Sequence, residues 1–174
     1  MMRVQNLFLI GPMGAGKTTV GKQLAEYYRK EFIDSDQEIQ RRTGVDIPTI
    51  FEFEGEAGFR QREHDVINKL TSREEIVLAT GGGAVINEDN RKLLSARGVV
   101  IYLHCTVEQQ FERTHRDKNR PLLQTPDPLT TLKSLMEERD PLYRQTSDLV
   151  ISTEGRNTQA VVHDIRKQLE SLNP

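Results

Sequence analysis

The stretch Gly11-Pro12-Met13-Gly14-Ala15-Gly16-Lys17-Thr18-Thr19 has the spacing G-x-x-x-x-G-K-[ST], which is typical of a phosphate-binding P-loop. Its glycines lack a Cβ atom, so the backbone can turn left-handed and direct several N–H groups at one phosphate. An apolar run at residues 7–10 predicts a buried strand before the loop, and residues 18–28 predict a helix after it, whose N-terminus also attracts phosphate. Because strand, loop and helix follow in this order, the stretch indicates a nucleoside triphosphate site rather than a simple glycine turn.

Two side chains of this P-loop have chemistry of their own. Lys17 supplies a positive charge for the β- and γ-phosphates, and the hydroxyl of Thr18 is a ligand for the Mg²⁺ that accompanies them. The residues expected to contact the nucleotide in this stretch are Gly14, Ala15, Gly16, Lys17, Thr18 and Thr19.

The length and composition of the chain limit the kind of P-loop protein it encodes. Its 174 residues suit one domain with a proper core, and its formal net charge of −2 gives no basic field for an extended nucleic acid. A small substrate is therefore favoured. Near the N-terminus, Arg3 and a short apolar run are too little for a signal peptide or a membrane span, which predicts a cytoplasmic protein. Cys105 is the single cysteine and is expected to be a small buried residue.

Four more apolar runs predict strands at residues 32–33, 76–79, 99–103 and 149–151. They lack alternation, as parallel strands covered by helices on both faces do. Helix-start signals lie between them, at the capping box Thr106-x-x-Gln109, at Asp127-Pro128 and at Asn157-Thr158. The sequence therefore predicts an α/β fold with a five-stranded parallel sheet and helices on both faces.

Residues 35–72 depart from this alternation. Gly44, Pro48, Gly55 and Gly58 are expected to divide the segment into short helices in place of one crossover helix. We interpret this insertion as a candidate substrate cap.

Asp34-Ser35-Asp36 follows the second predicted strand, at the edge where open α/β sheets bind ligands. One carboxylate can orient Mg²⁺ or its waters beside Thr18, while the other accepts a proton from an attacking hydroxyl group. The alternative is a purely structural role, in which Asp36 caps a helix over residues 37–42.

The third predicted strand runs into Thr80-Gly81-Gly82-Gly83, where a loop without side chains lets backbone N–H groups approach a ligand. Tight packing between strand and helix would also explain three glycines. No carboxylate ends this strand, so the acidic metal partner must come from elsewhere, with Asp34 or Asp36 the nearest candidates.

Together these motifs resemble the shikimate kinase family, and the resemblance covers nearly the whole chain. It rests on residues 11–21, on Phe-Ile-Asp-Ser-Asp at 32–36, on Phe59-Arg60 within 54–63, on Ala-Thr-Gly-Gly-Gly at 79–83, on Arg-Pro-Leu-Leu at 120–123 and on Glu-Arg-Asp-Pro-Leu-Tyr at 138–143. It implies a nucleoside-monophosphate-kinase-like fold in a single kinase domain over residues 1–174, with a mobile lid at about 113–127. It also implies a monomer that uses ATP and Mg²⁺ to phosphorylate the 3-hydroxyl of shikimate in aromatic amino acid biosynthesis, with neither nucleic acid nor membrane as a partner.

The same resemblance implies roles for individual residues. Asp36 would contact the shikimate hydroxyls and act as base, and Asp34 would hold Mg²⁺ through water. Arg60 and Arg139 would grip the shikimate carboxylate, which suits the planar fork of a guanidinium. Gly81, Gly82 and Gly83 would line that pocket. Arg120, in the polar run that also contains Lys118, would close over ATP, and Arg156 matches an adenine-stacking position.

Three other functions are compatible with a P-loop. Another small-molecule kinase, such as one for gluconate, would also take an anionic acceptor. A nucleotide-binding regulatory module would bind ATP without phosphotransfer, and Asp36 argues against it. A nucleic-acid-associated P-loop protein would need a basic stripe that the composition does not show.

Overall fold

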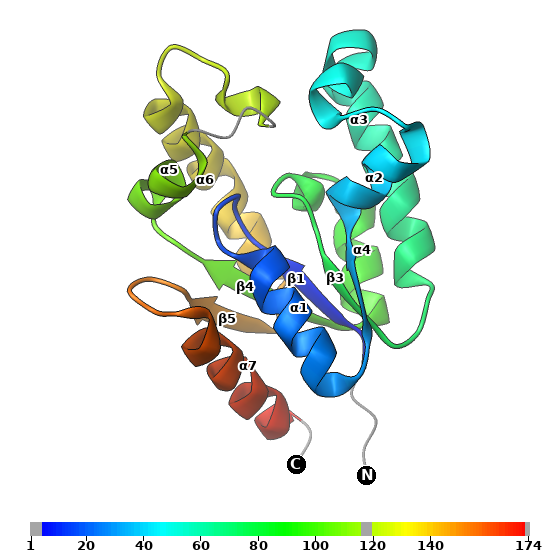
Figure 1. Ribbon diagram of the computed structural model, residues 1–174, viewed down its shortest axis with the longest axis vertical. Helices are drawn as coiled ribbons and strands as arrows, with labels where there is room; N and C mark the ends of the chain where they lie inside the picture. The colour runs from blue at the N-terminus through cyan, green and yellow to red at the C-terminus, as the bar shows by residue number, and fades with distance from the viewer. Residues whose placement is uncertain (1–4, 116–119, 173–174) are drawn as a thin grey trace.

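The computed structural model describes residues 5–115 and 120–172 of the chain. Its centre is a five-stranded parallel sheet in the order β2-β3-β1-β4-β5, and helices cover both faces (Figure 1). The strands are β1 (Leu7–Ile10), β2 (Glu31–Asp34), β3 (Ile76–Ala79), β4 (Val99–His104) and β5 (Leu149–Ser152). Each strand begins and ends within one residue of its predicted bounds, and the predicted fold class is confirmed.

The helices follow the predicted alternation. They are α1 (Lys17–Tyr28), α2 (Ser35–Thr43), α3 (Ile47–Thr71), α4 (Glu88–Arg97), α5 (Val107–Thr114), α6 (Pro128–Thr146) and α7 (Thr158–Leu172), with short 3-10 helices η1 (Ala84–Ile86) and η2 (Pro121–Leu123). Thr106 and Gln109 form the expected capping box of α5, and Asp127 caps α6. These caps satisfy backbone N–H groups that the first turn of a helix leaves without partners.

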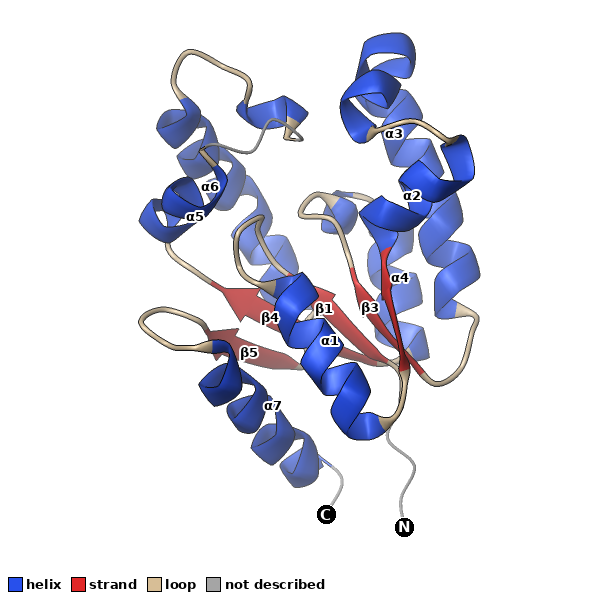
Figure 2. Cartoon of the chain, in the orientation of Figure 1, coloured by secondary structure: helices blue, strands red, loops and turns tan. Residues whose placement is uncertain are grey.

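The core lies on the two faces of the sheet, as the runs of apolar strand residues predict. Leu7 and Leu9 of β1 point into the cluster that α1 and α7 cover, whereas Phe8 and Ile10 point into the cluster that α3, α4 and α6 cover (Figure 2). Cys105 is buried, as expected. None of the helices within residues 5–115 and 120–172 is long and apolar enough to cross a membrane.

The segment 35–72 is less broken than the sequence suggested. It forms two helices, and only Gly44 and Gly55 interrupt them: Gly44 ends α2 at φ 75°, and Gly55 kinks α3 at φ 73°. Pro48 does not break the chain, because it lies in the first turn of α3, where a missing N–H costs nothing. Gly58 continues the helix, so the prediction of breaks at Pro48 and Gly58 was wrong.

The parallel sheet brings the polar loops together. Because all strands run in one direction, the segments that follow β1, β2 and β3 lie at the same carboxyl edge. These segments are the P-loop, the Asp34-Ser35-Asp36 turn and the glycine loop 81–83.

Candidate active site

The P-loop has the backbone that its glycines predict. Gly16 adopts φ 89° just before α1, and a Cβ atom at Gly11 would lie 2.4 Å from the carbonyl oxygen of Leu103. Lys17 opens α1, and its Nζ donates hydrogen bonds to the carbonyl oxygens of Gly11 (2.6 Å) and Pro12 (2.8 Å). Burial of the ammonium group, helped by the charge of Arg120, lowers the pKa of Lys17 to about 8. The lysine is thus held within the loop, where a phosphate would relieve its desolvation.

Thr18 and Asp34 meet beside the P-loop. The Thr18 hydroxyl donates a hydrogen bond to Oδ2 of Asp34 at 3.0 Å, while Oδ1 of Asp34 accepts one from the backbone N–H of Gln37 at 3.1 Å. Asp34 is therefore the residue that caps α2. The alternative in which Asp36 caps this helix was wrong, so the Asp36 carboxylate is not used as a helix cap.

Asp36 lies in the first turn of α2 with its carboxylate turned inward. Its Oδ1 is shielded from solvent and has no hydrogen-bond partner within the described chain. Burial, followed by the negative charges of Glu63 and Asp34, raises the pKa of Asp36 to about 7. A carboxylate with this proton affinity is suited to accept a proton near neutral pH.

The oxygen atoms around Thr18 fit Mg²⁺. A hydroxyl, the neighbouring Asp34 carboxylate and the unsatisfied Asp36 oxygen are hard ligands of the kind that this ion prefers. Over residues 5–115 and 120–172, no group of three or more His, Cys, Asp or Glu side chains could hold a metal. Mg²⁺ seldom uses an all-protein cage and keeps waters and substrate phosphates as ligands, so this sparse donor set suits it.

A first cavity opens between the glycine loop, α3 and η2 and holds about 470 Å³, including its solvent-open part. Its lining combines apolar and charged side chains. Its lining residues are Met13, Asp36, Ile47, Phe51, Phe59, Arg60, Glu63, Gly81, Gly82, Gly83, Arg120, Pro121, Leu122 and Arg139. The mixture suits a small ring that carries an anionic group.

Arg60 crosses the glycine loop. A Cβ atom at Gly83 would lie 2.4 Å from the Arg60 guanidinium, so the guanidinium can take this position only because residue 83 is glycine. Nη1 of Arg60 donates a hydrogen bond to Oε1 of Glu63 at 2.9 Å, and the Glu63 side chain is 1% exposed. The second oxygen of Glu63 has no partner in the part of the chain described.

Arg139 enters the same cavity from α6. The residue is 3% exposed, and its Nη1 lies 3.5 Å from the position of a Cβ atom at Gly82. A buried guanidinium is costly without an anion. Arg60 and Arg139 therefore provide two positive groups to the cavity. Burial raises the pKa of Glu63, and the charges of both arginines act against that rise.

A second cavity lies along the P-loop and holds about 580 Å³, including its solvent-open part. Its lining residues are Met13, Gly14, Gly16, Lys17, Thr18, Thr19, Asp34, Asp36, Thr80, Gly81, Gly82 and Arg120. Asp36 and Arg120 line both cavities, so a carboxylate and a guanidinium stand where the two meet. Ala15 is not among the lining residues, because its side chain packs into the core beneath the loop.

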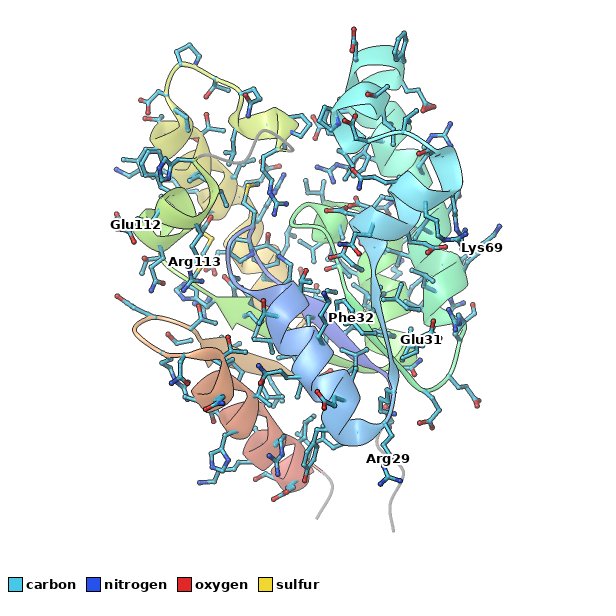
Figure 3. The ribbon with its side chains drawn as sticks, viewed as in Figure 1. Arg29, Glu31, Phe32, Lys69, Glu112 and Arg113 are labelled. Carbon is cyan, nitrogen blue, oxygen red and sulfur yellow. The ribbon has the colours of Figure 1, made fainter. Side chains whose placement is uncertain are left out.

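The predicted lid at about 113–127 is only partly within the described residues, because Lys118 and its neighbours at 116–119 lie outside them. Residues 113 and 114 belong to α5, and 121–123 form η2 directly after Arg120. Arg113, labelled in Figure 3, begins the predicted lid segment and donates a hydrogen bond to the Gly14 carbonyl at 2.5 Å. It is thus attached to the P-loop itself.

Arg156 lies between β5 and α7, away from both cavities. Its guanidinium donates hydrogen bonds to Oδ2 of Asp164 (3.0 Å) and to the carbonyl oxygen of Ser152 (3.1 Å). The residue does not line either cavity, and its expected contact with adenine stays a prediction.

Sequence reasoning missed three residues of this site. Glu63 and Tyr143 lie within quoted motifs but had no assigned role, and Arg113 was included only as the first residue of the predicted lid. The i,i+3 spacing of Arg60 and Glu63 on one helix was the available signal for the first. The contacts of Tyr143 and Arg113 join segments far apart in the chain, so no local pattern marks them.

Comparison with known proteins supports the resemblance seen in the motifs. The family model described as shikimate kinase matches residues 13–170. A shikimate kinase of Methylococcus capsulatus is 58% identical over 95% of this chain and 92% of its own length, and one of Vibrio cholerae is 53% identical over 98% of each. The structure of a shikimate kinase from Acinetobacter baumannii in complex with shikimate superposes with a TM-score of 0.96 at 52% identity, over 98% of this chain and 95% of that one. The chain therefore belongs to the shikimate kinase family.

Proposed function

We propose that this protein transfers the γ-phosphate of ATP to the 3-hydroxyl of shikimate, giving shikimate 3-phosphate and ADP, a step of chorismate and aromatic amino acid biosynthesis. The observation that carries the proposal is the meeting of the two cavities at Asp36 and Arg120. One cavity has the P-loop at its base and the other has paired arginines, so donor phosphate and anionic acceptor face each other across one carboxylate. Family membership selects shikimate over gluconate as the acceptor.

The P-loop side binds and neutralises the nucleotide. Backbone N–H groups of residues 14–19 and the N-terminus of α1 receive the phosphates, and Lys17 adds a charge that follows the γ-phosphoryl group. Thr18 would hold Mg²⁺ directly and Asp34 through water, and the ion would neutralise charge on the β- and γ-phosphates. Arg156 would contact the adenine ring.

Asp36 acts on the acceptor hydroxyl. As the oxygen of the 3-hydroxyl forms its bond to the γ-phosphorus, the bond from phosphorus to the ADP oxygen breaks and the hydroxyl proton passes to the Asp36 carboxylate. Arg120 lies at the boundary of both cavities and stabilises the charge on the transferring group. Because the transition state of phosphoryl transfer is loose, positioning and charge neutralisation supply most of the rate.

The acceptor is oriented by its carboxylate. Arg60 and Arg139 offer bidentate forks to it, and Glu63 holds the Arg60 guanidinium by a 2.9 Å hydrogen bond. The glycine loop 81–83 lets backbone N–H groups approach the same ligand. The apolar lining residues of the cavity would then contact the ring.

Replacement of Arg139 by lysine should raise the KM for shikimate by roughly 10- to 100-fold and leave the KM for ATP nearly unchanged. The ammonium keeps the charge but loses the bidentate fork, which is worth about 1.5–3 kcal/mol for a charge-assisted hydrogen bond. Steady-state kinetics with each substrate varied in turn measure both constants. If only the KM for ATP increased, Arg139 would have to contact the nucleotide and not the acceptor.

The pH dependence of kcat/KM should be bell-shaped. Asp36 must be deprotonated to accept a proton, and its pKa is raised to about 7, so activity should fall as the pH drops through that value. Lys17 must be protonated to attract phosphate, and its pKa is lowered to about 8, so kcat/KM for ATP should fall above that value. A profile that stays flat from pH 6 to 9 would contradict both assignments.

A coupled assay of ADP release with shikimate, quinate or gluconate as acceptor tests the proposed function directly. We expect release that depends on shikimate. A regulatory nucleotide-binding module would bind ATP and release no ADP with any acceptor, and a gluconate kinase would respond to gluconate alone. We also propose that the single domain acts as a cytoplasmic monomer on these small molecules, which sedimentation at assay concentrations would check for the oligomeric state.

A further inference from the structure

Tyr143 lies on α6, one turn after Arg139, and the mechanism above gives it no task. The residue is 1% exposed, and its hydroxyl donates a hydrogen bond of 2.5 Å to the carbonyl oxygen of Gly82. This bond joins positions that are 61 residues apart in the chain. It connects the helix that carries Arg139 to the loop against which Arg139 packs.

The glycine loop needs such external attachments. Three successive glycines have no side chains to fix them and lose more backbone entropy on ordering than other residues do. Ser35 anchors one side of the loop, because its Oγ accepts a hydrogen bond from the Gly81 N–H at 3.1 Å. Tyr143 anchors the peptide between Gly82 and Gly83, and it does so from α6, whereas Ser35 belongs to α2.

Arg139 takes part in the same arrangement. Burial raises the pKa of Tyr143, so the phenol keeps its proton and remains a donor to the Gly82 carbonyl, while the positive charge of Arg139 acts in the opposite direction. Nη1 of Arg139 lies 3.5 Å from the position of a Cβ atom at the same Gly82. The hydroxyl and the guanidinium therefore meet at one residue of the loop.

We propose that the Tyr143 hydroxyl is a positioning group for the carboxylate of the acceptor: it holds the Arg139 guanidinium and the Gly82 peptide at one fixed separation, so that both meet the same anion. The proposal rests on the proposed function, since it concerns how the acceptor is gripped. Tyr143 itself need not touch the acceptor. It acts through Arg139 and through the glycine loop.

The neighbouring Tyr102 provides a matched control. The two rings pack together with centroids 4.8 Å apart, and both residues are buried. The Tyr102 hydroxyl donates to Oδ1 of Asp140 at 2.6 Å, on the side of α6 that faces away from the acceptor cavity. Removing either hydroxyl deletes one hydrogen bond from the same aromatic pair, but only one of them reaches the glycine loop.

Tyr143→Phe should raise the KM for shikimate by roughly 5- to 50-fold, the range expected when a buried carbonyl loses its partner. The KM for ATP and kcat should stay within about threefold of the parent values, because the P-loop is untouched. Tyr102→Phe should leave the shikimate constant unchanged, although both variants should unfold at a lower temperature. Replacement of Tyr143 by 4-aminophenylalanine, whose N–H can still donate to Gly82, should restore the KM for shikimate to the parent value.

A double-mutant cycle tests whether Tyr143 works through Arg139. In an Arg139→Lys background, Tyr143→Phe should raise the shikimate KM less than twofold further, because the fork that it positions is already lost. Full additivity, an unchanged KM in Tyr143→Phe, or an equal rise in Tyr102→Phe would each overturn the proposal. If the parent enzyme did not phosphorylate shikimate in this assay, the proposed function itself would be wrong. That result is distinguishable from a failure of the Tyr143 proposal, in which the parent enzyme is active and only the variants behave differently from expectation.

Discussion

Replacement of Arg120 by alanine should lower kcat by about 10³-fold or more, the effect of removing an arginine that stabilises a transferring phosphoryl group in cis. Arg120 lines both cavities, and its positive charge lowers the pKa of both Lys17 and Asp36. Shikimate binding in the presence of ADP, measured by titration calorimetry, should survive, because Arg60 and Arg139 remain. Loss of this positive charge should also raise the pKa of Asp36. The fall of kcat/KM on the acid side of the pH profile should therefore occur at higher pH in the variant.

Arg62→Ala is the matched control for this loss of charge. Arg62 is an exposed arginine of α3 that pairs with Glu54 at 2.7 Å and lines neither cavity. Its kcat should match that of the parent enzyme. If Arg120→Ala abolished shikimate binding while Arg139→Lys left it intact, the roles of the two site arginines would be reversed.

Asp36→Asn should be nearly inactive and yet more stable than the parent enzyme. Loss of the base should reduce kcat by about 10²- to 10⁴-fold, while the Kd for ATP stays close to normal because the P-loop is intact. The carboxylate is destabilising where it stands, since burial and the charges of Glu63 and Asp34 raise its pKa from 3.8 to about 7. Removing that charge should add about 1–3 kcal/mol to the free energy of unfolding at pH 8.

The sign of this stability difference follows from the two pKa values. The native protein holds the Asp36 proton up to about pH 7, whereas the unfolded chain releases it near 3.8. The contribution of Asp36 to the free energy of unfolding therefore falls as the pH rises between these values and levels off above pH 7. Urea unfolding of the nucleotide-free proteins should show the advantage of Asp36→Asn growing from pH 5 to pH 7. A constant advantage would mean that packing, not charge, is responsible.

Asp46→Asn should behave in the opposite way and serves as the control. Asp46 caps α3, and its hydrogen bonds from the side chain and backbone of Thr49 lower the pKa of its carboxyl. Its contribution is present at neutral pH and is lost in acid, so the asparagine variant should be less stable at pH 7 and equal to the parent enzyme at low pH. Its kcat should not change, because Asp46 lies outside both cavities.

Most of the fold could be predicted because its signals are local. The central strands β1, β3 and β4 are apolar runs that are almost entirely buried, whereas the edge strands β2 and β5 carry exposed residues. The helix starts at Thr106 and Asp127 are side-chain caps that need only a few neighbouring residues. The helices of 35–72 were less predictable, because proline and glycine break a helix only at certain positions. Pro48 fits a first turn, and Gly58 stays helical where its neighbours hold the chain.

The motifs of the site could be predicted from the sequence, but the contacts between their side chains could not. The sequence placed the P-loop, the two aspartates and the glycine loop at one sheet edge, but the spacing of Asp34 and Asp36 did not reveal which of them caps α2. Arg113 and Tyr143 contact partners on other elements, and these contacts exist only once the chain has folded.

The close packing of the glycine loop limits how this enzyme can acquire a new acceptor. A methyl group at residue 83 would lie 2.4 Å from Arg60, and one at residue 81 would lie 2.7 Å from Oδ1 of Asp36. Libraries that vary this loop should therefore consist mostly of inactive proteins. Laboratory evolution toward other hydroxy acids has more freedom at the apolar lining residues Phe51 and Leu122, which can change size without displacing a charge.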